Sequence, residues 1–242
     1  MKLSKEDKEF LKTYNTDEYK HPSVTVDMLI FTVEDGQLKL MLIKRKNPPY
    51  KDCWAIPGGF VEIDESIKMA AMRELREETG ILCGTALEQL GAYGEVNRDP
   101  RTRVISIAYI ALISPATFSY EMIAGDDAKE VKLFEVYLDD ELYFDDEIDL
   151  AFDHAQIIKD GINRLREKLK YTDIAFELLD KDSFTVRDLH RVYQAISGKS
   201  ILITNFRRTF ENTYLKNGKV KETGEFSRRY QRPAKLYKLV EE

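Results

Sequence analysis

The chain has 242 residues, of which 43% are hydrophobic and 33% are charged, the composition of a globular protein with a substantial core. No run approaches the roughly 20 apolar residues that span a bilayer, and the charged N-terminus lacks the apolar stretch of a secretory signal. Two cysteines, Cys53 and Cys83, are too few for a disulfide framework and lack zinc-ligand spacing. The sequence therefore predicts a cytoplasmic protein with no membrane contact, built as one large domain or two ordinary ones.

The net charge of -6 is unevenly distributed. Residues 121–150 contain 12 Asp and Glu against two Lys, whereas residues 185–238 contain 13 Lys and Arg against four Asp and Glu. Asymmetry of this size predicts that the two segments meet different partners. A solvated surface explains the acidic segment equally well.

The first part of the chain alternates short arms, strands and turns. Residues 1–20 are polar and predict a short helix or arm. Residues 24–33 and 38–45 are rich in apolar and β-branched side chains and predict two strands. Asp35-Gly36 between them supplies the positive φ angles of a hairpin turn. Trp54–Ile56 predicts a further short strand, ended by a Pro-Gly-Gly turn.

The next part carries the longest periodic patterns. Apolar residues recur at a helical spacing between Asp64 and Thr79. Strands are predicted around 87–94, over 104–113, where the run is almost continuously apolar, and over 133–137. An acidic stretch then leads into a predicted helix over 152–170.

Carboxylates gather on one face of the helix predicted between Asp64 and Thr79. Glu74, Glu77 and Glu78 stand at i, i+3 and i+4, so they share that face. Repulsion at this spacing destabilises an isolated helix, but hard divalent cations such as Mg²⁺ require oxygen ligands of this kind. The pattern therefore admits two interpretations, a solvated helix face and a metal site.

A known motif favours the metal site. Gly59, Glu65 and the run from Arg73 to Ile81 resemble the Nudix box at every defined position. The resemblance implies that Glu74, Glu77 and Glu78 bind metal together with the carbonyl of Gly59. It implies supporting catalytic roles for Glu65 and Arg73, and Mg²⁺, with Mn²⁺ as an alternative, as the cofactor.

The implied chemistry is metal-assisted substitution at phosphorus, in which a metal lowers the pKa of bound water and stabilises charge on the phosphate oxygens. The reaction also requires a general base, which in Nudix enzymes often lies on a loop outside the box. Asp126, Asp127 and Glu130 are candidates, although a solvated loop accounts for each of them as well.

Two further segments resemble the Nudix branch that handles ADP-ribose and includes the Nudix-related transcriptional regulators of NAD metabolism. They are the loop 98–101 with the strand that follows it, and the segment Leu150–His154. Arg98 and Arg101 near a metal cluster suit a phosphate of a nucleoside diphosphate sugar such as ADP-ribose, although surface ion pairs would also explain them. His154 is given no catalytic role.

The C-terminal part predicts a winged helix. Short helices at 173–179, 186–197 and 203–212 precede a basic segment and a final strand. Thr185 caps the middle helix, and Thr204 or Asn205 opens a basic recognition helix. The order and residues resemble the winged helix of the same regulators. The residues expected at double-stranded DNA are Thr204, Asn205, Arg207, Arg208, Arg228 and Arg229.

We therefore expect an α+β protein: an α/β/α Nudix sandwich with a mixed sheet over 1–150, a connector helix over 151–172, and a winged helix over 173–242. The predicted function is a homodimeric regulator that reads a palindromic operator, senses ADP-ribose and hydrolyses it to AMP and ribose 5-phosphate. Two alternatives stay open: an ADP-ribose pyrophosphatase whose C-terminal domain serves dimerisation, and a sugar-responsive regulator without hydrolysis.

Overall fold

The computed structural model describes residues 3–79, 87–116, 128–229 and 233–240. The elements in chain order are α1 (Lys5–Thr13), the 3-10 turn η1 (Thr16–Glu18), β1 (Ser23–Glu34), β2 (Gln37–Arg45), β3 (Trp54–Ala55), β4 (Gly58–Phe60), α2 (Ile67–Thr79), β5 (Leu87–Tyr93), β6 (Val104–Leu112), β7 (Ala128–Leu138), β8 (Leu142–Phe144), α3 (His154–Lys168), the 3-10 helix η2 (Ile174–Leu178), α4 (Val186–Ser197), α5 (Ile203–Phe210), the π-helix η3 (Glu211–Leu215), β9 (Val220–Ser227) and β10 (Ala234–Leu239).

A mixed sheet forms the centre of the first two thirds of the chain. Its strand order is β5-β6-β1-β2-β7-β8, with β3 paired to β2 and β4 paired to β1. Only β1 and β6 run parallel to each other; the other described pairs are antiparallel. The β1–β2 hairpin turns at Asp35 and Gly36, whose φ angles of 54° and 84° confirm the predicted turn.

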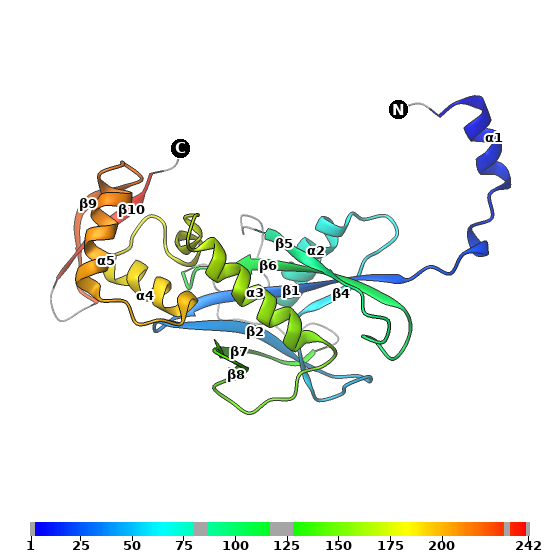
Figure 1. The fold of residues 1–242 in the computed structure, drawn as a ribbon, viewed down its shortest axis with the longest axis horizontal. Helices are drawn as coiled ribbons and strands as arrows, with labels where there is room; N and C mark the ends of the chain where they lie inside the picture. Colours follow the sequence, from blue (N-terminus) through cyan, green and yellow to red (C-terminus); the bar gives the residue numbers. More distant parts are fainter. Residues whose placement is uncertain (1–2, 80–86, 117–127, 230–232, 241–242) are drawn as a thin grey trace.

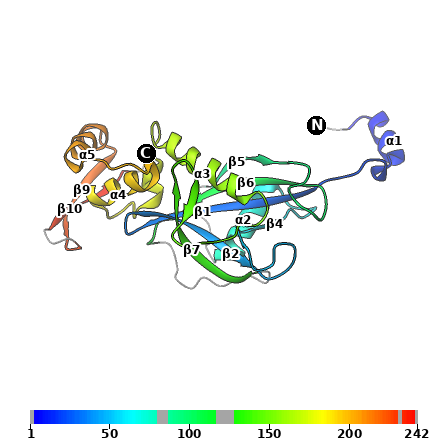
Figure 2. The ribbon, with the colours of Figure 1, turned by 60° about the horizontal axis from the view of Figure 1, so that its bottom comes forward.

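Both faces of this sheet are covered by a helix, which explains the continuous apolar run Met28–Phe31 in β1. Met28 and Ile30 pack on the face that α2 covers with Ala70 and Leu75. The intervening Leu29 lies in the other cluster of core residues, beneath α3. Figures 1 and 2 show α3 lying across the sheet and α2 behind it. The sandwich predicted from the sequence is confirmed.

The C-terminal elements form a winged helix that continues the same hydrophobic core. The side chain of Thr185 accepts a hydrogen bond from the backbone of Asp188 and caps α4, as predicted, and Gly198 ends the helix at φ 67°. Leu189, Val192 and Ile196 are buried along its inner face. In Figure 1 this unit lies beyond the turn of the β1–β2 hairpin, whereas α1 projects from the opposite end of the molecule.

Several local predictions need correction. The segment predicted as a helix at 173–179 is the short 3-10 helix η2. β4 and β8 were not expected, because a run of two glycines and an acidic run have low strand propensity; pairing to β1 and β7 overrides it. The recognition helix α5 begins after Leu202, so Thr204 and Asn205 lie inside its first turn and neither caps it.

No described helix is long and apolar enough to cross a membrane.

Candidate active site and nucleic-acid interface

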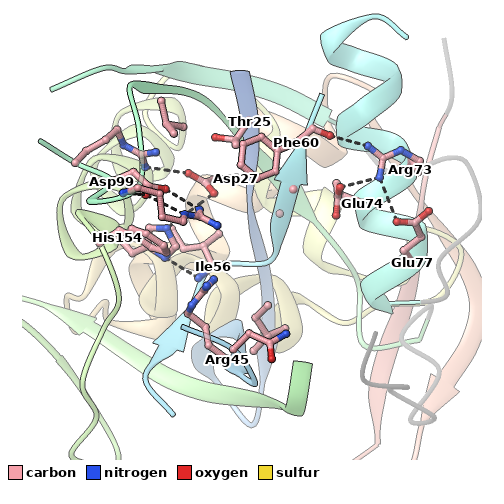
Figure 3. Close-up of a pocket in the computed structure, with 18 of the residues that line it drawn as sticks. Thr25, Asp27, Arg45, Ile56, Phe60, Arg73, Glu74, Glu77, Asp99 and His154 are labelled. Atoms are coloured by element: carbon pink, nitrogen blue, oxygen red, sulfur yellow. Dashed lines mark hydrogen bonds and ion pairs between the residues drawn. The ribbon is translucent and has the colours of Figure 1, made fainter. Parts of the chain in front are cut away.

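A cavity of about 940 Å³ opens on one side of the sheet. It lies where β4, the second half of α2, the loop after β5 and the segment before α3 converge (Figure 3). The predicted residues Gly59, Arg73, Glu74, Glu77, Arg98 and Arg101 all line it. The fold thus brings together two groups of residues that the sequence only suggested separately.

Arg73 is the centre of the first group. It donates hydrogen bonds to both carboxylate oxygens of Glu65, at 2.7 and 3.2 Å. Its Nη1 also contacts Glu74 at 2.7 Å and Glu77 at 3.2 Å. Glu65 accepts a further bond from the backbone of Glu62. Arg73 and Glu65 therefore hold the two glutamates in place.

Gly59 allows the close approach of strand β4 to the helix α2. A Cβ atom at this position would lie 2.1 Å from Oε1 of Glu74, so any larger residue would displace that carboxylate. β4 in turn pairs Gly59 with Val26 of β1. The sheet therefore fixes the main chain of Gly59 directly beside the carboxylate of Glu74.

The electrostatics of this group fit a divalent cation. Burial raises the pKa of the Glu74 carboxyl, and the hydrogen bond from Arg73 opposes that shift. Three carboxylates already converge on a single positive group, and Mg²⁺ requires oxygen donors of this kind. The described side chains alone do not assemble three acidic or metal-ligating residues around one point. Glu78 lies in α2, but its side chain is outside the described residues.

Arg98 is the centre of the second group, at the opposite end of the cavity. Its guanidinium forms a bidentate pair with Asp153, at 2.7 and 2.9 Å, and contacts Asp27 at 3.3 Å. Burial favours a lower pKa for Arg98, but these two carboxylates outweigh it and raise that pKa. Arg98 lines the cavity, but the chain's own acidic residues fix its orientation.

Arg101 contacts an acidic partner as well. It donates to both oxygens of Asp99, at 3.0 and 2.7 Å, and this pairing lowers the pKa of the Asp99 carboxyl. Its side chain is 44% exposed, in contrast to 4% for Arg98. The guanidinium lies over the rings of Phe60 and Phe152. Of the two predicted arginines, Arg101 is therefore the more accessible to a ligand.

His154 is a buried residue that lines the cavity. Its Nδ1 accepts a hydrogen bond from the backbone N–H of Ile56 at 3.0 Å, which places the proton on Nε2, 3.9 Å from Asp27. Burial lowers the pKa of this imidazole. The geometry gives His154 a structural role.

Sequence reasoning missed Asp27, Arg45, Phe152 and Asp153, all of which lie at the cavity or in the Arg98 network. Asp27 left one signal, because it is the one charged residue in the strand predicted over 24–33. Among the proposed bases, Glu130 lies on β7 and does not line the cavity. Asp126 and Asp127 lie outside the described residues.

The winged helix presents its basic residues to solvent. Thr204, Asn205, Arg207 and Arg208 are exposed on α5, whose Phe206 and Phe210 face the core. Arg228 and Arg229 are exposed at the end of β9, where the wing begins its turn. Helix and wing therefore offer cations of the kind that contact DNA phosphates.

Family models match both parts of the chain. Residues 21–160 match the NUDIX domain, and residues 175–239 match the NrtR DNA-binding winged helix domain. The chain belongs to the Nudix family, in its NrtR branch. Nudix hydrolases generally use a divalent metal.

Individual relatives agree with this assignment. The chain is 34% identical to the ADPR responsive transcriptional repressor NtrR of Acinetobacter baylyi, over 96% of this chain and 87% of that protein. It is 43% identical to an ADP-ribose pyrophosphatase of Methanocaldococcus jannaschii over 62% of this chain and 78% of that protein. The crystal structure of Shewanella oneidensis NrtR with a 27mer DNA is 31% identical, with a TM-score of 0.73, covering 90% of this chain and 93% of that one.

Proposed function

We propose that this protein is a transcriptional repressor that senses ADP-ribose and also hydrolyses it with Mg²⁺. The observation that carries the proposal is the coexistence of two intact sites. A Nudix cavity retains Glu65, Arg73, Glu74 and Glu77 in one network, and a winged helix exposes its basic residues. The relative named for ADP-ribose response aligns with 96% of this chain. The relative named for ADP-ribose hydrolysis aligns with 62% of it.

The charge of the cavity supports a need for metal. Among the described residues, five acidic side chains and four arginines line it. Arg73, Arg98 and Arg101 each have a carboxylate partner at 2.7 Å. A diphosphate adds two negative charges to a wall that is already slightly negative, so its binding requires added cations. Mg²⁺ supplies them, and Mn²⁺ can replace it.

In the proposed reaction, the oxygen of a water molecule forms a bond to one phosphorus, and the bridging P–O bond breaks. The products are AMP and ribose 5-phosphate. The bound metal would activate the water and stabilise charge on the diphosphate. Glu74, Glu77, Glu78 and the Gly59 carbonyl are the proposed ligands. Arg73 and Glu65 orient them, and Arg101 contributes positive charge at the opposite end of the cavity.

We propose that successive parts of the chain have different functions. Residues 1–150 form the Nudix part, 151–172 connect, and 173–242 bind double-stranded DNA through Arg207, Arg208, Arg228 and Arg229, with Thr204 and Asn205 facing the bases. A palindromic operator requires a second copy of the winged helix, so we propose a homodimer.

The first experiment measures ADP-ribose turnover with and without Mg²⁺ in the wild type and in Glu78→Gln. We expect metal-dependent cleavage that the substitution abolishes, because a ligand carboxylate is lost. Binding of ADP-ribose without cleavage would remove hydrolysis from the proposal and leave a sensor. Equal turnover in both proteins would contradict the metal assignment.

An ADP-ribose pyrophosphatase that uses its C-terminal domain only for dimerisation is the second candidate, favoured by the 43% identity to the M. jannaschii enzyme. Filter binding separates the two. The protein would first select a duplex from a random-sequence library, and its affinity for that duplex would then be measured at two salt concentrations. A repressor loses affinity steeply as salt rises and releases the duplex when ADP-ribose is added. Failure to select any duplex would favour the pyrophosphatase.

A further inference from the structure

The segment that leads into α3 is fixed to β3 at successive positions. The backbone N–H of Trp54 donates to the carbonyl of Asp149, and the N–H of Ala151 donates back to Trp54, both at 2.8 Å. Ile56 donates to the ring of His154 at 3.0 Å. Asp153 is fixed from the other side by its bidentate pair with Arg98. Both neighbours of Phe152 are therefore immobilised.

Phe152 itself adopts an unfavourable backbone conformation. Its φ angle is 55°, in the left-handed region that side chains larger than glycine rarely occupy. A large aromatic residue remains in this conformation only where its surroundings impose it, and such residues concentrate at ligand sites. Here the bonds to Ala151 and Asp153 impose it. The ring lines the cavity as a result.

Two arginines lie against this ring. The guanidinium carbon of Arg45 is 5.0 Å from the ring centroid, and that of Arg101 is 6.0 Å from it. The ring of Tyr50 packs against it in a T-shaped arrangement, at 4.8 Å between centroids. An aromatic face attracts a guanidinium and orients its plane, while the N–H groups at its rim can still donate to an anion. The backbone of Pro49 also orients Arg45, by accepting a bond from its Nε at 2.9 Å.

We propose that Phe152 is a positioning residue for the ligand, holding Arg45 and Arg101 so that both bind the diphosphate of a nucleoside diphosphate sugar. The inference rests on the proposed function and adds two things to it. Arg45 becomes a ligand-binding residue. Arg98 becomes a buried support, because Asp27 and Asp153 already occupy its guanidinium.

Calorimetric titration of the full chain with the non-hydrolysable α,β-methylene analogue of ADP-ribose, in the presence of Mg²⁺, tests this. Phe152→Leu keeps an apolar side chain but removes the aromatic face, so we expect the Kd to rise about tenfold. Phe152→Tyr keeps the face and should bind within about twofold of the wild type. Arg45→Met should weaken binding at least as much as Phe152→Leu does.

Two variants separate positioning from general stability. Phe144→Leu is the matched control, because Phe144 is also partly buried and packs on an aromatic neighbour, Phe134, but lies outside the cavity. It should leave the Kd unchanged. Phe152→Gly removes the backbone strain along with the ring, so its Kd should rise as in Phe152→Leu while its melting temperature falls less.

The outcomes separate this inference from the proposed function. If the wild type binds the analogue, two results would overturn the role of Phe152 alone. One is a Kd of Phe152→Leu equal to that of the wild type, and the other is a Kd of Phe152→Tyr raised as much as that of Phe152→Leu. Absence of binding by the wild type would overturn the ADP-ribose assignment and this inference with it.

Discussion

The two ends of the cavity contain similar residue types but differ in how the chain assembles them. At one end, Arg73 gathers Glu65, Glu74 and Glu77, which all come from one short stretch around α2. At the other end, Arg98 joins Asp27 of β1 to Asp153 before α3, residues far apart in the sequence. The first group is local and the second is held together only by the fold.

The central arginines of the two ends differ in exposure, whereas the carboxylates of Glu65 and Glu74 are as buried as that of Asp27. Glu77 has a side-chain exposure of 55% and Arg73 of 27%, so a metal or a ligand can reach them. Arg98 is 4% exposed and Asp27 10%. We therefore expect the accessible charges at the carboxylate end to serve chemistry, and the buried Arg98 and Asp27 to serve structure. The following predictions test that division.

The largest effect is expected from Arg98→Met. It leaves Asp27 and Asp153 without their partner, and breaking a buried pair costs about 3–5 kcal/mol. Urea denaturation would measure the loss in the free energy of unfolding. A loss below about 1 kcal/mol would show that solvent compensates the two carboxylates and that the arginine end is not a structural support.

Glu77→Gln should act on turnover instead. Substitution of residues that only support metal ligands typically lowers metal affinity or activity by about 10- to 100-fold. Because Glu77 is a proposed ligand itself, we expect turnover of ADP-ribose to fall by about a hundredfold or more. The free energy of unfolding should change little, because the side chain is half exposed. Glu167→Gln, an exposed glutamate on α3, is the control. A large loss in the free energy of unfolding of Glu77→Gln would contradict the expectation that the accessible charges at the carboxylate end serve chemistry and not stability.

His154 should make the arginine end sensitive to acid. Burial depresses its pKa in the folded state below the ordinary 6.5. The stability that neutral His154 contributes is therefore present above pH 6.5 and is lost as the pH falls from there through the lower folded pKa. A single group can contribute at most about 1.4 kcal/mol for each pH unit.

Denaturation midpoints between pH 8 and pH 5 would measure this slope. His154→Asn offers an acceptor oxygen to Ile56 but does not titrate, so its slope should be shallower than that of the wild type. Identical slopes in the two proteins would assign the acid sensitivity to other groups.

The smallest effect on stability is expected from Arg101→Met, below about 1 kcal/mol, because its pair with Asp99 is partly exposed. The same substitution should weaken binding of the ADP-ribose analogue, since Arg101 is the accessible arginine. Paired measurements on Arg98→Met and Arg101→Met would thus separate support from binding. Equal losses of stability in both would contradict the separation.

The sequence alone determined what depends on short spacing. The Nudix box marked Glu65, Arg73, Glu74 and Glu77 as neighbours in the sequence, and the contact between Arg73 and Glu77 is local because the two residues stand at i and i+4 on α2. Turn and cap residues predicted the hairpin at Gly36 and the start of α4 at Thr185 in the same way. The resemblance to the Nudix family implied a sheet covered on both faces.

Only the tertiary structure decided which charges are available to a ligand. Arg98 and Arg101 look equivalent in the sequence, yet strand β1 places Asp27 beside one of them and the chain before α3 adds Asp153. The left-handed backbone of Phe152, and the placement of Arg45 against its ring, likewise depend on bonds to β3. Local spacing fixes contacts within a helix turn or a hairpin. Contacts between distant segments arise only when sheet pairing and core packing bring those segments together.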